Sequence, residues 1–284
     1  MQGWPHFIPT NTKINYLNEL LKVGFDTLDF GSFVSPTAIP QMADTKEVIS
    51  KLELENSKTK LLAIIANKRG AEDAMAFDQI TYLGFPFSIS ETFQQRNANS
   101  SVDESLKRVE DIQNLCVKNK KELVVYISMG FGNPYGDEYN TDIAIKRTRQ
   151  IINLGVKIVS VADTVGLATP EEVRELMLKI VPEFPAIEIG VHLHSSPEQR
   201  EEKISAALNA GCLRFDSAIK GIGGCPMAGN DLVGNMDTEV MINFLEQKGY
   251  SLNLNKEALI KCSSMAAEIF TSPPAPLLKR GEQS

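Results

Sequence analysis

Short runs of apolar residues recur along the chain, rich in the β-branched side chains typical of buried strands. Seven such runs are present, at 24–31, 60–66, 79–85, 122–130, 156–164, 186–194 and 213–219. Amphipathic segments with helical spacing lie between them, for example at 12–23, 102–118, 142–154, 170–181 and 197–209. Strands that alternate with helices and are apolar on both faces predict a parallel sheet covered by helices.

Two of these helices have clear start signals in the sequence. Thr169-Pro170 and Ser196-Pro197 each place a capping hydroxyl before a proline, and proline fits well in the first turn of a helix. We therefore expect a helix to begin at each of these two sites.

The order of elements indicates the fold. Each predicted strand is followed by a helix, as in a (β/α)8 TIM barrel, and one further helix, 12–23, precedes the first predicted strand. We therefore expect an α/β fold, a TIM barrel whose first strand would lie before Met1. An open doubly wound sheet is the alternative, although no glycine-rich dinucleotide fingerprint follows an early strand.

Length, net charge and cysteine content limit the number of domains and the classes of partner that we expect. The 284-residue chain suits one catalytic barrel, expected over residues 1–270, and residues 271–284 are expected to be a disordered or foreign tail. A net charge of −7 argues against nucleic acid and anionic membranes as partners. The four cysteines form no CxxC pair, so a cytoplasmic location is expected.

Polar side chains gather where the predicted strands end. They are Asp29, Asn67, Ser88, Ser90, Glu91, Asn133, Asp163, Thr164, His192, His194, Asp216 and Ser217. The carboxyl ends of barrel strands form the active-site face of a TIM barrel, so this pattern predicts a site there. The alternative is that these strand ends are polar only because they are solvated.

The two histidines at 192 and 194 are candidate metal ligands. They stand two residues apart on a predicted strand, so both side chains point to the same side. Neutral imidazoles suit a divalent metal, and carboxylates can complete its shell. A pair of hydrogen-bonded imidazoles at a strand end is the alternative.

A glycine-rich segment, 220–235, contains five glycines in sixteen residues, as expected of a loop that closely approaches other groups. Cys225 lies inside it, where a reactive thiol on a closing loop is a sharper interpretation than a structural cysteine. Asn235 stands at its far end, and its amide oxygen can bind a hard metal. A turn that tolerates any small residue is the alternative.

Together these segments resemble the 3-hydroxy-3-methylglutaryl-CoA (HMG-CoA) lyases, within the wider group of divalent-metal TIM-barrel lyases and synthases. The resemblance runs from about Gln2 to about Phe270. The segments that carry it are SFVSPTAIPQMAD (32–44), SETFQQRNAN (90–99), GNPYG (132–136), SVADTVGLATP (160–170), HLH (192–194), IGGCP (222–226) and GN (234–235).

The resemblance implies a metal site and two catalytic residues. His192, His194 and Asn235 match the metal-binding residues of the family, and the implied metal is Mg2+ or Mn2+. Cys225 matches the active-site loop cysteine, and Asp163 matches an aspartate near the substrate hydroxyl. The implied reaction is a retro-Claisen cleavage of HMG-CoA to acetyl-CoA and acetoacetate, as in leucine degradation. Asp163 would be the base and Cys225 would deliver a proton to the departing enolate.

Other positions are implied to lie around the substrate or to depart from the family. Asp29 stands where the family has an acidic residue near the metal. Gln2, Asn133 and Thr164 are the expected substrate-binding residues, although the family often has cysteine at the position of Asn133. Ser195 replaces the aspartate that follows the second histidine. An acyl-CoA substrate and a homodimer are the expected partners.

The family carries an Arg-Asp pair just upstream of the glutamine that matches Gln2, and by register this pair would lie before Met1. On that interpretation we expect residues 1–284 alone to have low lyase activity, and an upstream extension with Arg-Asp to raise it. Two other functions remain open. One is a metal-dependent enzyme that condenses an acyl-CoA with a 2-oxo acid, and the other is a non-catalytic metal-binding barrel.

Overall fold

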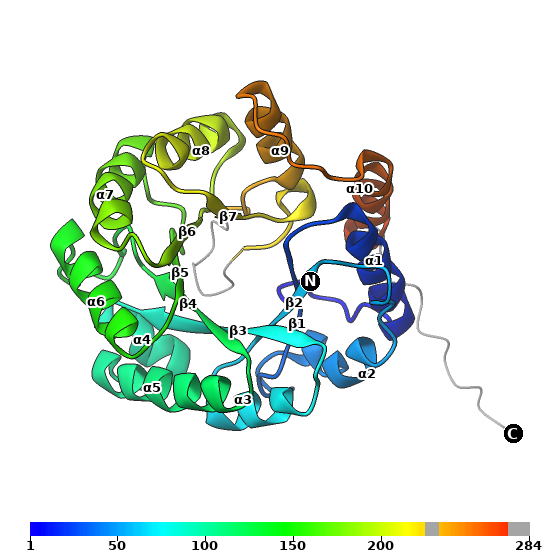
Figure 1. Cartoon of the computed structure of the whole chain (residues 1–284), viewed down its shortest axis with the longest axis horizontal. Helices are drawn as coiled ribbons and strands as arrows, with labels where there is room; N and C mark the ends of the chain where they lie inside the picture. Colours follow the sequence, from blue (N-terminus) through cyan, green and yellow to red (C-terminus); the bar gives the residue numbers. More distant parts are fainter. Residues whose placement is uncertain (225–232, 272–284) are drawn as a thin grey trace, which may run out of the picture.

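The computed structural model describes residues 1–224 and 233–271, which form a ring of parallel strands surrounded by helices (Figure 1). Seven strands pair in sequence order within these residues, and every neighbouring pair is parallel. The strands are β1 (Thr27–Ser32), β2 (Lys60–Ile64), β3 (Ile80–Ser88), β4 (Glu122–Ser128), β5 (Ile158–Ala162), β6 (Glu188–His192) and β7 (Arg214–Asp216). The predicted α/β class and the seven predicted strands are confirmed.

Helices cover the outside of this ring, and at least one follows each strand (Figure 1). They are α1 (Thr10–Val23), α2 (Thr45–Ile49), α3 (Lys68–Met75), α4 (Glu91–Ala98), α5 (Val102–Lys118), α6 (Thr141–Asn153), α7 (Pro170–Glu183), α8 (Arg200–Asn209), α9 (Thr238–Gln247) and α10 (Lys256–Thr271). No helix in the described part of the chain is long and apolar enough to cross a membrane.

The helix start predicted at Thr169-Pro170 is confirmed, whereas the one predicted at Ser196-Pro197 begins as a short 3-10 helix without a side-chain cap. Thr169 caps α7 with a full capping box, in which its hydroxyl accepts from the Glu172 amide and the Glu172 carboxylate accepts from the Thr169 amide. At the second site, Pro197–Gln199 forms a 3-10 turn and α8 begins only at Arg200. The Ser196 hydroxyl bonds the Glu198 carboxylate and makes no helix cap.

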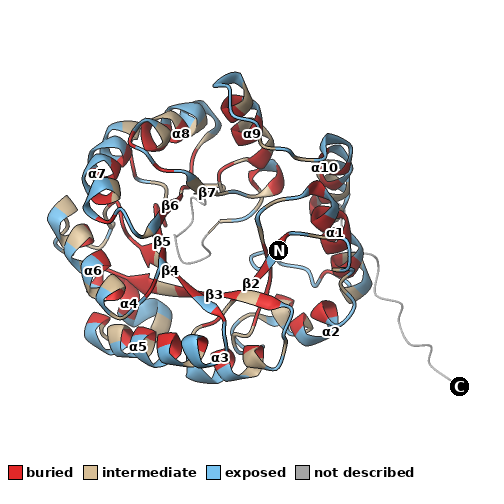
Figure 2. Cartoon of the chain, viewed as in Figure 1, coloured by how far each residue is buried: buried red, intermediate tan, exposed pale blue. Residues whose placement is uncertain are grey.

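Most residues of β1 to β6 are buried and those of β7 are half-buried, whereas the helices expose their outer sides (Figure 2). One face of the sheet packs against the helices in a large apolar core. The other face points into the ring, where Leu62, Tyr82, Val124 and Ile158 form a separate apolar cluster. This inner cluster fills the interior between the described strands, as in other barrels, and the ends of the strands are where active sites of such barrels form.

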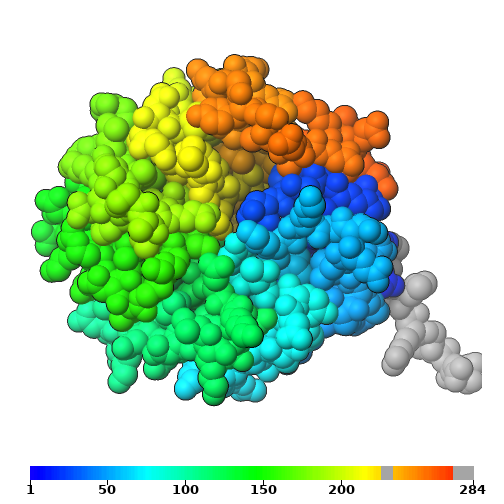
Figure 3. All heavy atoms as spheres, in the orientation of Figure 1, coloured from blue at the N-terminus to red at the C-terminus, as the bar shows by residue number. Residues whose placement is uncertain are grey.

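Helices bring the two ends of the ring together. The N-terminal residues lie against α10 (Figure 3), where Lys261 of α10 forms an ion pair with Glu19 of α1 at 2.8 Å. The Asn255 amide, just before α10, donates to the Val23 carbonyl at 2.9 Å. Residues 272–284, which include most of the predicted tail, lie outside the described residues.

Candidate active site

The two histidines predicted as metal ligands lie together at the carboxyl end of β6. His192 is the last residue of the strand, and its ring centre is 5.4 Å from that of His194. His194 lies beyond the strand and forms an isolated antiparallel bridge with Asn235. The three residues predicted as metal ligands are therefore neighbours, although Asn235 is 41 positions further along the chain than His194.

The surroundings of His194 prepare it to bind a metal through one nitrogen. Its Nδ1 donates to the Val233 carbonyl at 3.1 Å, which leaves Nε2 as the nitrogen with a lone pair. Burial, and then the neighbouring charge of His192, lower the pKa of the His194 imidazole to about 4. The ring is therefore neutral at pH 7, as a metal ligand must be.

Asn235 is oriented by the glycine-rich segment. Its Nδ2 donates to the Ile222 carbonyl at 2.9 Å, so the amide oxygen is the atom left to bind a cation. Gly223 has a φ of +96°, and a Cβ at this position would lie 3.0 Å from Asn235 Nδ2. A glycine is needed here because both the backbone angle and the close approach exclude a side chain.

His192 faces the carboxylate of Asp216, which was expected only as one of the polar residues at the strand ends. Its Nδ1 has no hydrogen-bond partner among the described residues and lies 3.4 Å from Asp216 Oδ2, a long contact. Burial acts to raise the pKa of Asp216, but His192 and Arg214 outweigh it and the net shift is downward. Asp216 is therefore an ionised carboxylate beside His192, and carboxylates in such positions commonly orient metal-binding histidines.

Asp163, the predicted base, is held by a lysine that the sequence did not single out. Its Oδ2 accepts from Lys203 Nζ at 2.9 Å, and its Oδ1 accepts from the Ala168 amide at 3.1 Å. Lys203 Nζ also donates to the His194 carbonyl at 2.8 Å. The only signal in the sequence is the place of this lysine on the inner face of its helix, beside Ile204.

Asp29 and Gln2 line a cavity of about 100 Å3 between the N-terminal residues and β1. The Asp29 carboxyl lines this small cavity, where its removal from bulk water raises its pKa to about 7. Asp216 raises that pKa further, and the charges of the N-terminus and His192 act in the opposite direction. The pKa of Asp29 therefore depends on the charges of Asp216 and His192 at the histidine site.

Two of the predicted substrate-binding residues make hydrogen bonds in the loops, Asn133 within its own loop and Thr164 to the loop that follows β4. Asn133 Oδ1 accepts from the amides of Tyr135 and Asp137, and Asn133 Nδ2 donates to the Asp137 carbonyl. Thr164 Oγ1 accepts from the Met129 amide at 2.8 Å. Their contacts with substrate stay predictions. Cys225 lies outside the described residues, so its place relative to the site also stays a prediction.

The donor set at the barrel mouth fits a divalent cation. No three His, Cys, Asp or Glu side chains within residues 1–224 and 233–271 converge as a metal site. Two imidazoles lie side by side, and the backbone bridge brings Asn235 next to the second of them. Imidazole nitrogens and amide oxygens are ligand types that Mg2+, Mn2+ and their relatives accept. His192 Nδ1 has no hydrogen-bond partner among the described residues, and the nearest charged group is the Asp216 carboxylate. Asp216 thus stands where metal-binding histidines commonly have an outer carboxylate.

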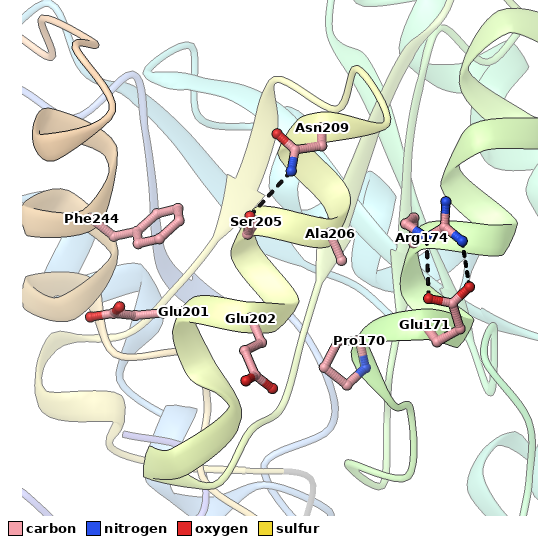
Figure 4. Close-up of a pocket in the computed structure, with 9 residues that line it drawn as sticks. All are labelled: Pro170, Glu171, Arg174, Glu201, Glu202, Ser205, Ala206, Asn209 and Phe244. Carbon is pink, nitrogen blue, oxygen red and sulfur yellow. Dashed lines mark hydrogen bonds and ion pairs between the residues drawn. The ribbon is translucent and has the colours of Figure 1, made fainter.

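A second hollow lies on the outside of the barrel, between α7, α8 and α9 (Figure 4). Its volume is about 460 Å3, and four of its polar residues pair with one another. Arg174 pairs with Glu171, and Asn209 donates to Ser205 at 3.2 Å. This outer hollow shares no residue with the barrel mouth, and the barrel mouth is the better candidate for a catalytic site.

Comparison with known proteins agrees with this geometry. The model of the family described as HMGL-like matches residues 1–266. The chain is 30% identical over 273 residues to the hydroxymethylglutaryl-CoA lyase YngG of Bacillus subtilis, covering 96% of this chain and 90% of that protein. The crystal structure of the HMG-CoA lyase from Brucella melitensis superposes with a TM-score of 0.89 at 27% identity, covering 95% of each chain.

A further similar structure contains ligands. The HMG-CoA lyase from Acinetobacter baumannii, in complex with coenzyme A and 3-methylmalate, superposes with a TM-score of 0.87 at 28% identity. The match covers 100% of this chain and 92% of that one. The TM-scores confirm the predicted barrel fold.

Proposed function

Because the chain belongs to the HMGL-like family, we propose that it cleaves HMG-CoA to acetyl-CoA and acetoacetate. The observation that carries this proposal is the convergence of His192, His194 and Asn235 at the carboxyl end of β6. In the same place Asp163 supplies a fixed carboxylate. An acyl-CoA substrate is supported by the coenzyme A bound to the similar lyase from Acinetobacter baumannii.

The cleavage needs a base, a broken carbon–carbon bond and an acid. The proton of the tertiary hydroxyl leaves, the bond between C2 and C3 breaks, and the electron pair of that bond becomes the enolate of acetyl-CoA. The former hydroxyl carbon becomes the ketone of acetoacetate. The enolate then takes up one proton, so that one substrate gives two products with no other reactant.

The residues of this chain divide these tasks between them. We assign the removal of the hydroxyl proton to Asp163, whose two oxygens keep further lone pairs beyond those used by Lys203 and Ala168. Protonation of the enolate is assigned to Cys225 from its position in the IGGCP segment. Gln2 and Asp29 line the adjoining cavity and are proposed to contact the substrate.

We propose that His192, His194 and Asn235 hold Mg2+ or Mn2+. A bound cation of this kind polarises substrate oxygens and orients them. Neutral His194 and the Asn235 amide oxygen support this assignment, because neither must lose a proton at pH 7 to bind. A homodimer remains a prediction. A cytoplasmic location is proposed on the free cysteines Cys116, Cys212 and Cys262.

The proposal is tested by comparing two histidine substitutions in an HMG-CoA cleavage assay. His194→Ala should lower the rate by about 100-fold or more, since loss of a supporting residue alone costs about 10–100-fold. His6→Ala removes an exposed histidine outside the site and should leave the rate unchanged. Equal rates for His194→Ala and the unsubstituted protein would exclude the proposed site.

A further inference from the structure

Lys203 is a fully buried lysine with two acceptors and no other described partner. Its side chain has 0% exposure, and its ammonium group donates to Asp163 Oδ2 at 2.9 Å and to the His194 carbonyl at 2.8 Å. A buried ammonium group is strongly unfavourable unless it is paired and hydrogen-bonded. The position of the lysine is therefore fixed by these two acceptors.

The two acceptors belong to different parts of the proposed site. Asp163 follows β5 and is itself only 2% exposed. His194 follows β6 and bridges to Asn235. A single ammonium group on α8 thus fixes the carboxylate relative to the backbone of a proposed metal ligand. The Asp163 amide, which donates to the His192 carbonyl at 3.0 Å, adds a second connection between the same two strand ends.

We propose that Lys203 is a positioning residue for the active site, with consequences for both metal binding and catalysis. Its bond to the His194 carbonyl sets the direction in which the His194 side chain leaves the chain, and so supports the metal ligands. Its bond to Asp163 holds the carboxylate where the substrate hydroxyl would lie. The catalytic part rests on the proposed cleavage reaction, whereas the part that concerns metal binding rests only on the proposed metal site.

The chain offers a matched lysine for comparison. Lys121 is also buried, at 8% exposure, and its Nζ donates to the carbonyls of Phe77 and Ile80 at 2.8 and 2.7 Å. It lies just before β4, at the opposite end of the strands from the histidines. Replacing it removes a comparable pair of hydrogen bonds without touching the site.

The test compares Lys203→Met with Lys121→Met in three measurements: thermal unfolding, Mn2+ affinity by electron paramagnetic resonance, and steady-state kinetics with HMG-CoA. Both variants should unfold at a lower temperature. Lys203→Met should also weaken Mn2+ binding by about 10-fold and lower kcat by about 10–100-fold, with a smaller change in KM. Lys121→Met should change neither. The proposal is overturned if Lys203→Met keeps the Mn2+ affinity and kcat of the unsubstituted protein.

A second variant keeps the test decisive if Lys203→Met does not fold. The double variant Asp163→Asn with Lys203→Met removes the buried carboxylate that would otherwise be left unpaired. It should fold but still bind Mn2+ about 10-fold more weakly, because the His194 carbonyl lacks its donor. Unchanged Mn2+ affinity in the double variant overturns the proposal. If the unsubstituted protein does not cleave HMG-CoA, the proposed function fails, and the Mn2+ measurements still decide the role of Lys203.

Discussion

His192 and His194 stand two residues apart, but their surroundings give their imidazoles different properties. The His194 ring is 3% exposed and hydrogen-bonded to Val233, whereas the His192 side chain keeps 34% exposure and faces Asp216. Val233 approaches His194 from a segment about 40 positions further along the chain. A contact with a distant segment of the chain therefore determines which nitrogen of the His194 ring is available to bind a metal.

The lowered pKa of His194 predicts a pH-dependent stability. Burial first, and His192 second, lower it from 6.5 to about 4, so below pH 6.5 the unfolded chain takes up a proton that the folded chain does not. The stability from neutral His194 is therefore full above pH 6.5 and is lost as the pH falls to about 4. The expected loss is about 3 kcal/mol of unfolding free energy.

Urea unfolding of the metal-free protein at pH 6.5 and pH 4 measures this effect. The unsubstituted protein and His6→Gln should lose about 3 kcal/mol more between these pH values than His194→Gln, which has no group to titrate there. A His194→Gln variant whose stability falls as steeply as that of the unsubstituted protein would show that His194 is not the group responsible.

At the scale of elements, the pairing of β6 with β7 places the charged groups beneath the site. Gly190 pairs in register with Arg214, and His192 pairs with Asp216. Arg214 extends across Gly190 to Glu188, which it contacts at 2.7 Å. Its positive charge helps to lower the pKa of Asp216. The register of one short strand therefore sets the charge that faces His192.

Gly190→Ala should disturb this arrangement. A Cβ at position 190 would lie 2.7 Å from Arg214 Cδ and 3.0 Å from Arg214 Cβ, too close to the root of the side chain to be relieved by its flexible end. We expect a loss of about 1–3 kcal/mol in unfolding free energy, measured by chemical denaturation. Gly3→Ala, which meets nothing within 4 Å, is the control.

Gly190→Ala made in an Arg214→Ala background shows whether the clash with the Arg214 side chain causes the loss of stability. If the clash with Arg214 is responsible, Gly190→Ala should cost much less in that background than in the unsubstituted protein. An equal cost in both backgrounds would place the strain elsewhere.

Helix starts give a second prediction at this scale. Thr169 and Ser196 stand in the same sequence context, before a proline, but only Thr169 forms a helix cap. Thr169→Ala should therefore lower the unfolding free energy by about 1 kcal/mol, whereas Ser196→Ala should change it by less than about 0.5 kcal/mol. Denaturant titration of the two variants side by side measures the difference, and equal losses would contradict the assigned caps.

At the scale of the whole molecule, the sequence predicts the barrel well because strand and helix periodicities are local properties. Apolar runs located all seven described strands, and the glycine-rich segment indicated a close approach without showing that its partner at Gly223 is Asn235. The roles of Lys203 and Asp216 could not be predicted in this way. Lys203 meets Asp163 across 40 positions and Asp216 meets Ser160 across 56, and such contacts exist only once the ring has formed.

The N-terminal residues illustrate the same limit. The Gln41 side chain accepts from the Ile8 amide at 2.8 Å and donates to the carbonyls of His6 and Trp4. This one side chain ties the segment that carries Gln2 to the residues after β1. In the sequence Gln41 was notable only as part of the resemblance over 32–44, because nothing local indicates a partner 33 positions away.

The central claim is that this barrel cleaves HMG-CoA at the site of His192, His194 and Asn235. Its most direct test is nuclear magnetic resonance of the products formed from 13C-labelled HMG-CoA with Mg2+, before and after a chelator is added. Acetyl-CoA and acetoacetate should form in a one-to-one ratio, at whatever rate, and no further product should form once the cation is removed. Labelled HMG-CoA that stays intact with every divalent cation tested, or products that continue to form after chelation, would contradict it.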